Sequence, residues 1–296
     1  MILQEFKRCW KAKINLIMMV AMFLALASPY LDVQSQRNGQ LRNIEAGVAL
    51  GLDASDSVWT YEGMQGALFV WERLVAGFGG ESILFLLVLF IMGAGIHVSG
   101  RLFSALETGY GTLLMTRMYY KTYLKQTLIA QFLYVMSFIL LFFGLLFLTL
   151  LIVEGGSLHL THLSGIGRHG DMAVWLYLLI QFGFILHIAI SMGLMILLAS
   201  VSFVFLKNRY IISFLPVGTL LGTFILAMLF FNINRLTYLL ARFLTYQYSL
   251  QNLFTFFSVT NSGGSLLFVF ANPLLLLLSF TLLYKLNVTK FGKDYV

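Results

Sequence analysis

The chain has 296 residues, of which 59% are hydrophobic and only 10% are charged, and its mean hydropathy is +0.88. Soluble domains carry about 25% charged residues, so this composition excludes a soluble enzyme, a disordered chain and a disulfide scaffold. A single cysteine, Cys9, cannot form an internal disulfide. The remaining class is a polytopic membrane protein, and the placement of the net charge of +7 can be tested against that class.

The segment before the first apolar stretch, residues 1–13, has a two-sided pattern. Ile2, Phe6, Cys9 and Trp10 can share one face of a helix, while the charged residues lie elsewhere. This pattern predicts an elbow helix in the inner membrane interface, anchored by Phe6 and Trp10, that leads into the first span. An ordinary basic flank before a membrane helix is the alternative.

Long intervals without charge predict an all-α protein with six membrane spans, because about 20 apolar residues cross a hydrocarbon core of about 30 Å. The spans are residues 14–31, 82–100, 126–153, 172–206, 210–234 and 266–284. The fourth is too long for one ordinary span, so its helix is expected to tilt or to project beyond the bilayer. The sixth begins at 266 because polar residues 255–265 before it end in a loop sequence.

The positions of the charges predict the orientation. If the N-terminus is inside and each span crosses once, the inner side receives 13 of the 19 Lys and Arg residues, every lysine among them, and 3 of the 12 acidic residues. Basic residues favour the cytoplasmic side of a membrane, so both termini are predicted to be cytoplasmic. The predicted topology therefore explains the basic net charge, and no nucleic-acid partner is expected. In the same topology, residues 32–81 are predicted to form a long outer loop.

The cytoplasmic loop between the second and third spans, residues 101–125, carries the most specific motif. It contains Glu107, Thr108, Gly109, Tyr110, Gly111, Thr112, Leu113, Leu114, Met115, Thr116 and Arg117, followed by Tyr123, Leu124 and Lys125. The two glycines permit a sharp change of backbone direction after the carboxylate. This stretch resembles the corresponding loop of type-2 ABC export permeases, although that family often has proline at the position of Arg117.

The resemblance implies that this loop docks into a groove of a separate ATP-binding subunit. By the resemblance, the residues that would contact the ATP-binding subunit are Glu107, Thr108, Gly109, Gly111 and Arg117. It also implies an N-terminal elbow helix, re-entrant helices between spans five and six in residues 235–265, and a second permease, identical or homologous. The chain contains no Gly-x-x-x-x-Gly-Lys-Ser/Thr sequence, so ATP would be bound by the partner subunit and no cofactor is expected here.

Other motifs have weaker interpretations. Gly218 and Gly222 form a Gly-x-x-x-Gly pair suited to close helix packing, and are candidates for contact with the second permease, with a chance occurrence as the alternative. The outer-loop histidines His159, His162 and His169 lack a helical zinc motif, so no metal is expected.

The expected function is that of the permease subunit of an ABC exporter in the cell membrane. It would itself be no enzyme, and it would move an amphipathic or hydrophobic substrate outward, such as a lipid, a drug or an antimicrobial peptide. The spans lack carboxylates, which weighs against an ion-coupled carrier. A membrane assembly or sensory subunit without transport is one alternative, and an intramembrane enzyme is another.

Overall fold

The computed structural model describes residues 2–49, 66–76, 80–108, 119–155, 174–230 and 266–291. These residues are almost entirely helical and contain no β-strand. Five helical segments among them are long and apolar enough to cross a membrane: Lys13–Gly47, Phe85–Ala105, Tyr120–Val153, Gln181–Val204 and Pro273–Phe291. The predicted all-α, multi-pass class is therefore confirmed. The predicted fifth span corresponds, in the described part, to a shorter apolar helix, Arg209–Gly222.

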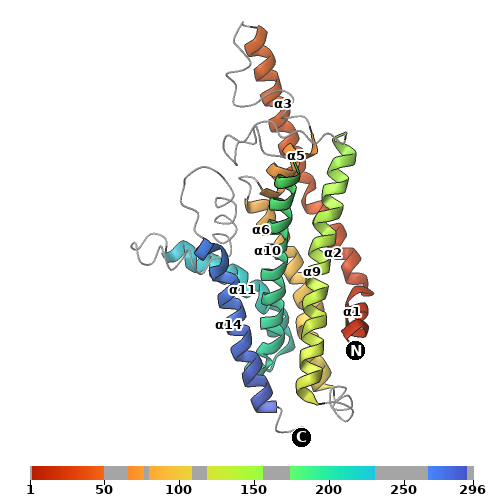
Figure 1. Cartoon of the computed structure of the whole chain (residues 1–296), viewed down its shortest axis with the longest axis vertical. Helices are drawn as coiled ribbons and strands as arrows, with labels where there is room; N and C mark the ends of the chain where they lie inside the picture. Colours follow the sequence, from red (N-terminus) through yellow and green to blue (C-terminus); the bar gives the residue numbers. More distant parts are fainter. Residues whose placement is uncertain are drawn as a thin grey trace.

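The chain begins with α1 (Ile2–Trp10), α2 (Lys13–Ala25) and α3 (Ala27–Ala49). Helices α2 and α3 are separated only by Leu26, so the first membrane helix continues well past residue 31, where the first span was predicted to end. Pro29 lies in the first turn of α3, where proline is tolerated. The polar half of α3 extends beyond the other helices at the upper end of the molecule (Figure 1).

The next described elements run from the upper end toward the lower end. They are α5 (Ala67–Trp71), the π-helical turn η2 (Glu72–Ala76), α6 (Gly80–Ala94), the π-helical turn η3 (Gly95–Ser99) and α7 (Gly100–Glu107). Together α6, η3 and α7 follow the predicted second span and then enter the predicted cytoplasmic loop. The lower end, as used here, is the end of the bundle where α7 lies (Figure 1).

The second half of the chain contributes the longest helices. The three longest described helices are α9 (Tyr120–Val153), α10 (Val174–Val201) and α14 (Leu266–Phe291), and between α10 and α14 lie the 3₁₀ turn η4 (Ser202–Val204) and α11 (Arg209–Phe230). Helix α9 runs upward, whereas α10 and α14 run back to the lower end (Figure 1). The far part of α11 turns away from α9 and α10 (Figure 1), and Pro216 lies inside this helix, where a proline loosens the backbone hydrogen bonding.

Among the described residues, two hydrophobic clusters hold the helices together, and Phe132 packs against both. The larger joins α1, α2, α5, α6, α9 and α10, and its fully buried members include Phe90 and Phe138, whose rings stack with centroids 5.1 Å apart. The smaller lies at the lower end and joins α7, the start of α9, the end of α10 and the start of α11. Helix α10 is buried along most of its length, whereas α14 exposes most of its apolar side chains.

Glycines let the second membrane helix approach its neighbours closely. A Cβ added at Gly95 would collide with the backbone oxygen of Ser213 in α11, and one added at Gly93 would collide with the flexible side chain of Met18 in α2. Small residues serve this purpose in membrane helices because lipid tails supply no hydrophobic driving force, so tight van der Waals packing must stabilise the bundle.

Replacing Gly95 with alanine should destabilise the bundle, because the new methyl group meets backbone rather than a movable side chain. We expect a loss of about 1–3 kcal/mol in unfolding free energy, measured by thermal unfolding in detergent. Gly144→Ala is the matched control, since no described atom lies within 4 Å of its added Cβ, and alanine in a helix is favourable. Equal thermal stability of the two variants would contradict the close approach of η3 to α11.

Candidate functional site

The predicted coupling site begins on α7, whose position is set by the smaller hydrophobic cluster. Leu102 is 1% exposed and packs in that cluster with Tyr120, Tyr123 and Leu124 of α9. At its C-terminal end α7 presents Glu107 and Thr108, both exposed. The hydroxyl and the backbone N–H of Thr108 both donate to the Ser104 carbonyl oxygen, at 2.8 and 3.0 Å, so the last turn of the helix is closed by its own residues.

The remaining residues of the predicted coupling motif are Gly109, Gly111 and Arg117. All three lie outside the described residues. What the structure shows is therefore a short helix held on its apolar side and carrying an exposed carboxylate at its C-terminal end. Such an end suits recognition by a partner with a basic or hydrogen-bond-donating surface.

The base of α7 is also fixed closely against α11. A Cβ added at Gly100 would lie 2.7 Å from the Ser213 hydroxyl oxygen and 3.2 Å from Cγ of Arg209. A larger residue at this position would push α7 away from the start of α11. The position of α7 is thus set by Gly100 against α11 and by Leu102 in the smaller cluster, and α7 also contacts α10.

The predicted elbow residues pack against α9. The Trp10 indole N–H donates to the Ser137 hydroxyl at 3.1 Å, and its ring centroid lies 5.8 Å from those of both Tyr134 and Phe138. Phe6 contacts Trp10 edge to face at 6.4 Å. The apolar face predicted for residues 1–13 is therefore directed at protein, while the opposite face of α1 is exposed.

A buried hydrogen-bond cluster at the α1–α2 junction was missed by sequence reasoning. The Asn15 amide donates to the carbonyl oxygens of Cys9 and Trp10 at 2.7 and 2.9 Å, and accepts from the Tyr134 hydroxyl at 2.6 Å. His97 of η3 donates to the same Cys9 oxygen at 3.3 Å. The cluster satisfies carbonyl groups at the end of α1 and joins this end to α9 and η3.

Cys9 lies within this junction and is 2% exposed. Burial raises the pKa of its thiol above the ordinary value, and this effect outweighs the opposing influence of Arg101, whose Nη1 donates to Sγ at 3.5 Å. A buried, protonated thiol is unreactive. A cysteine introduced at an exposed site can therefore be labelled selectively.

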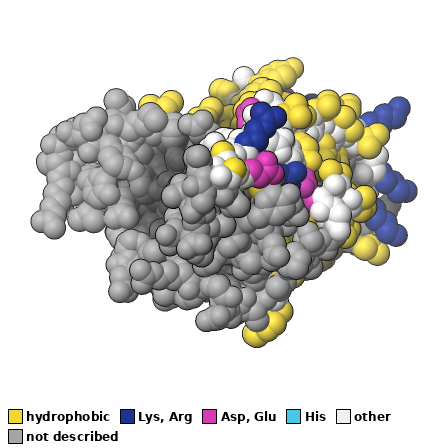
Figure 2. Space-filling view, turned by 90° about the horizontal axis from the view of Figure 1, so that it is seen from above, with side chains coloured by type: hydrophobic (Ala, Val, Ile, Leu, Met, Phe, Trp, Pro, Cys, Tyr) yellow, Lys and Arg dark blue, Asp and Glu magenta, His cyan; other side chains and the backbone are white. Residues whose placement is uncertain are grey.

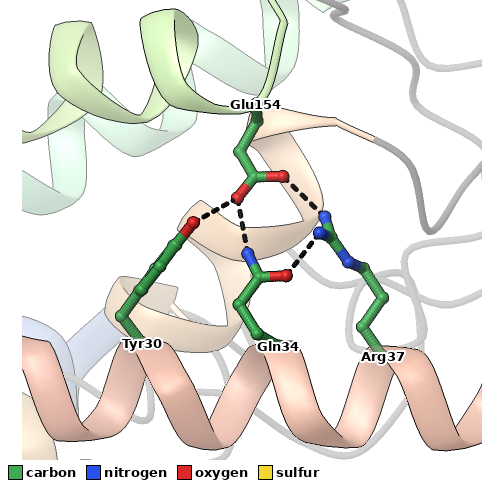
Figure 3. A network of polar contacts seen from close by, with 4 residues as sticks. All are labelled: Tyr30, Gln34, Arg37 and Glu154. Carbon is green, nitrogen blue, oxygen red and sulfur yellow. Dashed lines mark hydrogen bonds and ion pairs between the residues drawn. The ribbon is translucent and has the colours of Figure 1, made fainter.

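A second polar network lies near the upper end, where α3 meets the end of α9 (Figure 3). Glu154 accepts hydrogen bonds from the Tyr30 hydroxyl at 2.8 Å and the Gln34 amide at 2.5 Å, and pairs with Arg37 at 2.6 Å. Arg37 also donates to Gln34. The spacing of Tyr30, Gln34 and Arg37 along one helix face could have suggested the network, but only the fold supplies Glu154.

The predicted outer loop, residues 32–81, contains a short segment that the structure buries. Ala67–Trp71 are each at most 4% exposed. The Trp71 indole donates to the Gln181 side-chain oxygen of α10 at 3.3 Å, and its ring contacts Phe143 and Phe147 of α9. The apolar sequence Ala67–Trp71 could have indicated a buried segment, but it is much shorter than a membrane span and was therefore assigned to the loop.

The other predicted positions have different settings. On α11, no described atom lies within 4 Å of a Cβ added at Gly218 or Gly222, so the described part of the chain leaves space at this face. His159, His162 and His169 lie outside the described residues, as does the predicted re-entrant region 235–265.

Comparisons of the chain with protein-family models, with curated proteins and with solved structures find no match.

Removing the Glu154 carboxylate should destabilise the protein strongly. Its side chain is 6% exposed and that of Arg37 18%, so Glu154→Ala leaves a largely buried guanidinium without its counter-ion. We expect the free energy of unfolding to fall by about 3–5 kcal/mol, as measured by thermal or denaturant unfolding in detergent. Figure 2, which looks down on the upper end, shows acidic and basic side chains lying close together there.

The matched control is Glu5→Ala, which breaks the exposed pair Glu5–Arg8, with side chains 21% and 52% exposed. Exposed pairs contribute about 0–1 kcal/mol, so this variant should unfold close to the wild type. Similar losses in the two variants would show that the Glu154 network does not stabilise the α3–α9 contact.

Proposed function

We propose that this chain is the membrane-spanning permease subunit of a type-2 ABC exporter, located in the plasma membrane. The observation that supports the proposal best is the end of α7, where Glu107 of the family-like motif is exposed on a helix anchored to the bundle by its opposite side. An ATP-binding subunit would dock there. Two permeases and two ATPases would form the complete exporter.

In the proposed orientation the lower end is cytoplasmic and the chain crosses the membrane six times, with α11 as the fifth span. The described lysines support it, because they lie in or beside α1, at the start of α2 and α9, just before α11 and in the second half of α14, all toward that end of the bundle (Figure 1). They are Lys7, Lys11, Lys13, Lys121, Lys125, Lys207, Lys285 and Lys290. The upper end carries acidic residues such as Asp32, Glu45 and Glu154 beside its arginines. The positive-inside rule then assigns the two sides.

The length of α9 supports a cytoplasmic extension of the bundle. Its 34 residues measure about 51 Å, whereas the hydrocarbon core is about 30 Å thick. The third span was predicted to begin at residue 126. The first turns of α9, about 9 Å, together with α7 and the smaller cluster, would then project into the cytoplasm.

This arrangement suggests how ATP hydrolysis would move the membrane helices. A push on Glu107 would be transmitted through α7 to the smaller cluster, which contains residues of α9, α10 and α11. Packed cores move as units rather than deforming continuously. The spans would then shift relative to a second permease, whose contact we place at the Gly218–Gly222 face of α11.

The substrate class follows from the apolar character of the spans. Carboxylates are lacking within the predicted spans, which weighs against a gradient-coupled mechanism because such mechanisms commonly use a carboxylate at membrane depth. Energy would come from ATP in the partner subunit instead. An amphipathic or hydrophobic cargo such as a lipid, a drug or an antimicrobial peptide suits a path with these walls.

The proposed orientation predicts the side from which introduced cysteines are labelled. In a Cys9→Ser background, Asn43→Cys in α3 should react with an impermeant maleimide added to intact cells, because Asn43 is exposed on the upper helix. Asn208→Cys, which is exposed at the lower end, should react only after the cells are opened. Labelling of Asn208→Cys in intact cells would reverse the orientation.

Substitution of Glu107 tests the proposed coupling directly. Glu107→Ala should leave folding and insertion unchanged because the side chain is exposed. It should weaken capture of the ATP-binding subunit by about thirtyfold or more, since loss of one partner of an interface charge pair leaves the other unpaired. Co-purification and transport assays measure both effects.

Glu45→Ala is the matched control, because Glu45 is an exposed carboxylate on a helix at the opposite end. It should behave as the wild type in both assays. Wild-type co-purification of a P-loop ATPase with Glu107→Ala would contradict the coupling role. Failure of the wild type itself to bring down such an ATPase would favour an assembly or sensory subunit.

A further inference from the structure

The N-terminal helix and its connection to α2 carry exposed basic residues that the proposed transport function does not use. Cys9, Phe6 and Trp10 occupy the protein-facing side of α1. Leu3, Lys7 and Lys11, at intervals of four, lie on the other side and are exposed. We call the exposed basic residues of α1 and of its connection to α2 the basic face; they are Lys7, Arg8, Lys11 and Lys13.

We propose that the basic face binds the phosphate groups of anionic phospholipids in the leaflet at the lower end of the bundle. The proposal does not depend on ATP-driven transport. Clusters of four or more basic residues next to a membrane helix attract anionic lipids, and each charge contributes to the attraction.

The basic face lies at the depth where headgroups are expected. Lys13 is the first residue of α2, and the next exposed positions are Leu16 and Ile17, which are 71% and 65% exposed. The outer surface thus changes from ammonium groups to apolar side chains within one helical turn. Such a change marks the boundary between headgroups and acyl chains.

The charges of the basic face are largely uncompensated. Glu5 pairs with Arg8 at 3.0 Å. In the described part of the chain, no carboxylate lies within ion-pair distance of Lys7, Lys11 or Lys13. An anion that approaches this face therefore meets no competing acidic group at those three lysines.

The backbone that carries these side chains is held in place. Asn15 and His97 bind the Cys9 carbonyl oxygen, and Trp10 is tied to Ser137. The basic face is therefore presented at a constant height on the bundle, instead of lying on a loose tail. Pre-organisation of this kind lowers the entropic cost of binding.

A lipid explains this surface better than a free phosphate ion. Leu3 lies one turn before Lys7 on the same exposed side and is 62% exposed. Together with Leu16 and Ile17, it offers apolar surface on both sides of the lysines. Acyl chains can cover that surface, whereas inorganic phosphate cannot.

The test is a titration of the detergent-solubilised full chain with phosphatidylglycerol, followed by native mass spectrometry. Lys7→Gln/Lys11→Gln should weaken phosphatidylglycerol binding by about tenfold or more. Lys121→Gln/Lys125→Gln removes the same charge at the same spacing from another exposed helix face. Those lysines lie about 24 and 18 Å below the Trp10 contact along α9, so this control should bind as the wild type.

Three comparisons make the result decisive. Phosphatidylcholine should bind more weakly than phosphatidylglycerol, and Lys7→Arg/Lys11→Arg should keep the wild-type affinity, which separates charge from a folding defect. Inorganic phosphate at millimolar concentration should not displace the lipid. Equal loss in both glutamine variants, equal binding of the two lipids, or displacement by inorganic phosphate would each overturn the proposal.

Discussion

Hydrocarbon offers no hydrogen-bond partners, so every backbone carbonyl near membrane depth must be satisfied by the protein itself. A buried turn raises the same demand, and it arises at the α1–α2 junction, where the helical hydrogen bonds are interrupted and Cys9 is buried. Asn15 solves the problem by donating to the Cys9 and Trp10 carbonyl oxygens. Since Tyr134 and His97 join the same group, the turn also fixes α1 against α9 and η3.

The two hydrophobic clusters stabilise different parts of the bundle. The larger one packs helices that are long and apolar enough to cross a membrane, and their close contact depends on small residues such as Gly95. The smaller one lies at the lower end, beyond the Trp10 contact, and orients α7 through Leu102. An exposed carboxylate such as Glu107 can act on a partner only if its helix is held in this way.

Predictions from the sequence agreed with the structure where they rested on patterns among residues close together along the chain. Runs without charge predicted the all-α multi-pass class, and the alternation of residues in 1–13 anticipated which side of α1 is apolar. It did not anticipate the continuation of the first helix to Ala49, because helices that leave the bilayer lose the hydropathy signal. It also missed the buried segment at Trp71, which is too short to register as a span. The coupling motif beyond Thr108 stays a prediction.

The amino-acid sequence by itself determined the all-α, multi-pass class of the protein, because transfer of apolar and charged groups between water and lipid depends mainly on local composition; the sidedness of its charges stays a prediction. Tertiary structure alone decided which polar groups meet. Glu154 is separated from Arg37 by more than a hundred residues, yet the two form a largely buried pair at 2.6 Å. Such pairing depends on helix packing at ångström precision, and no local pattern in a single chain records it.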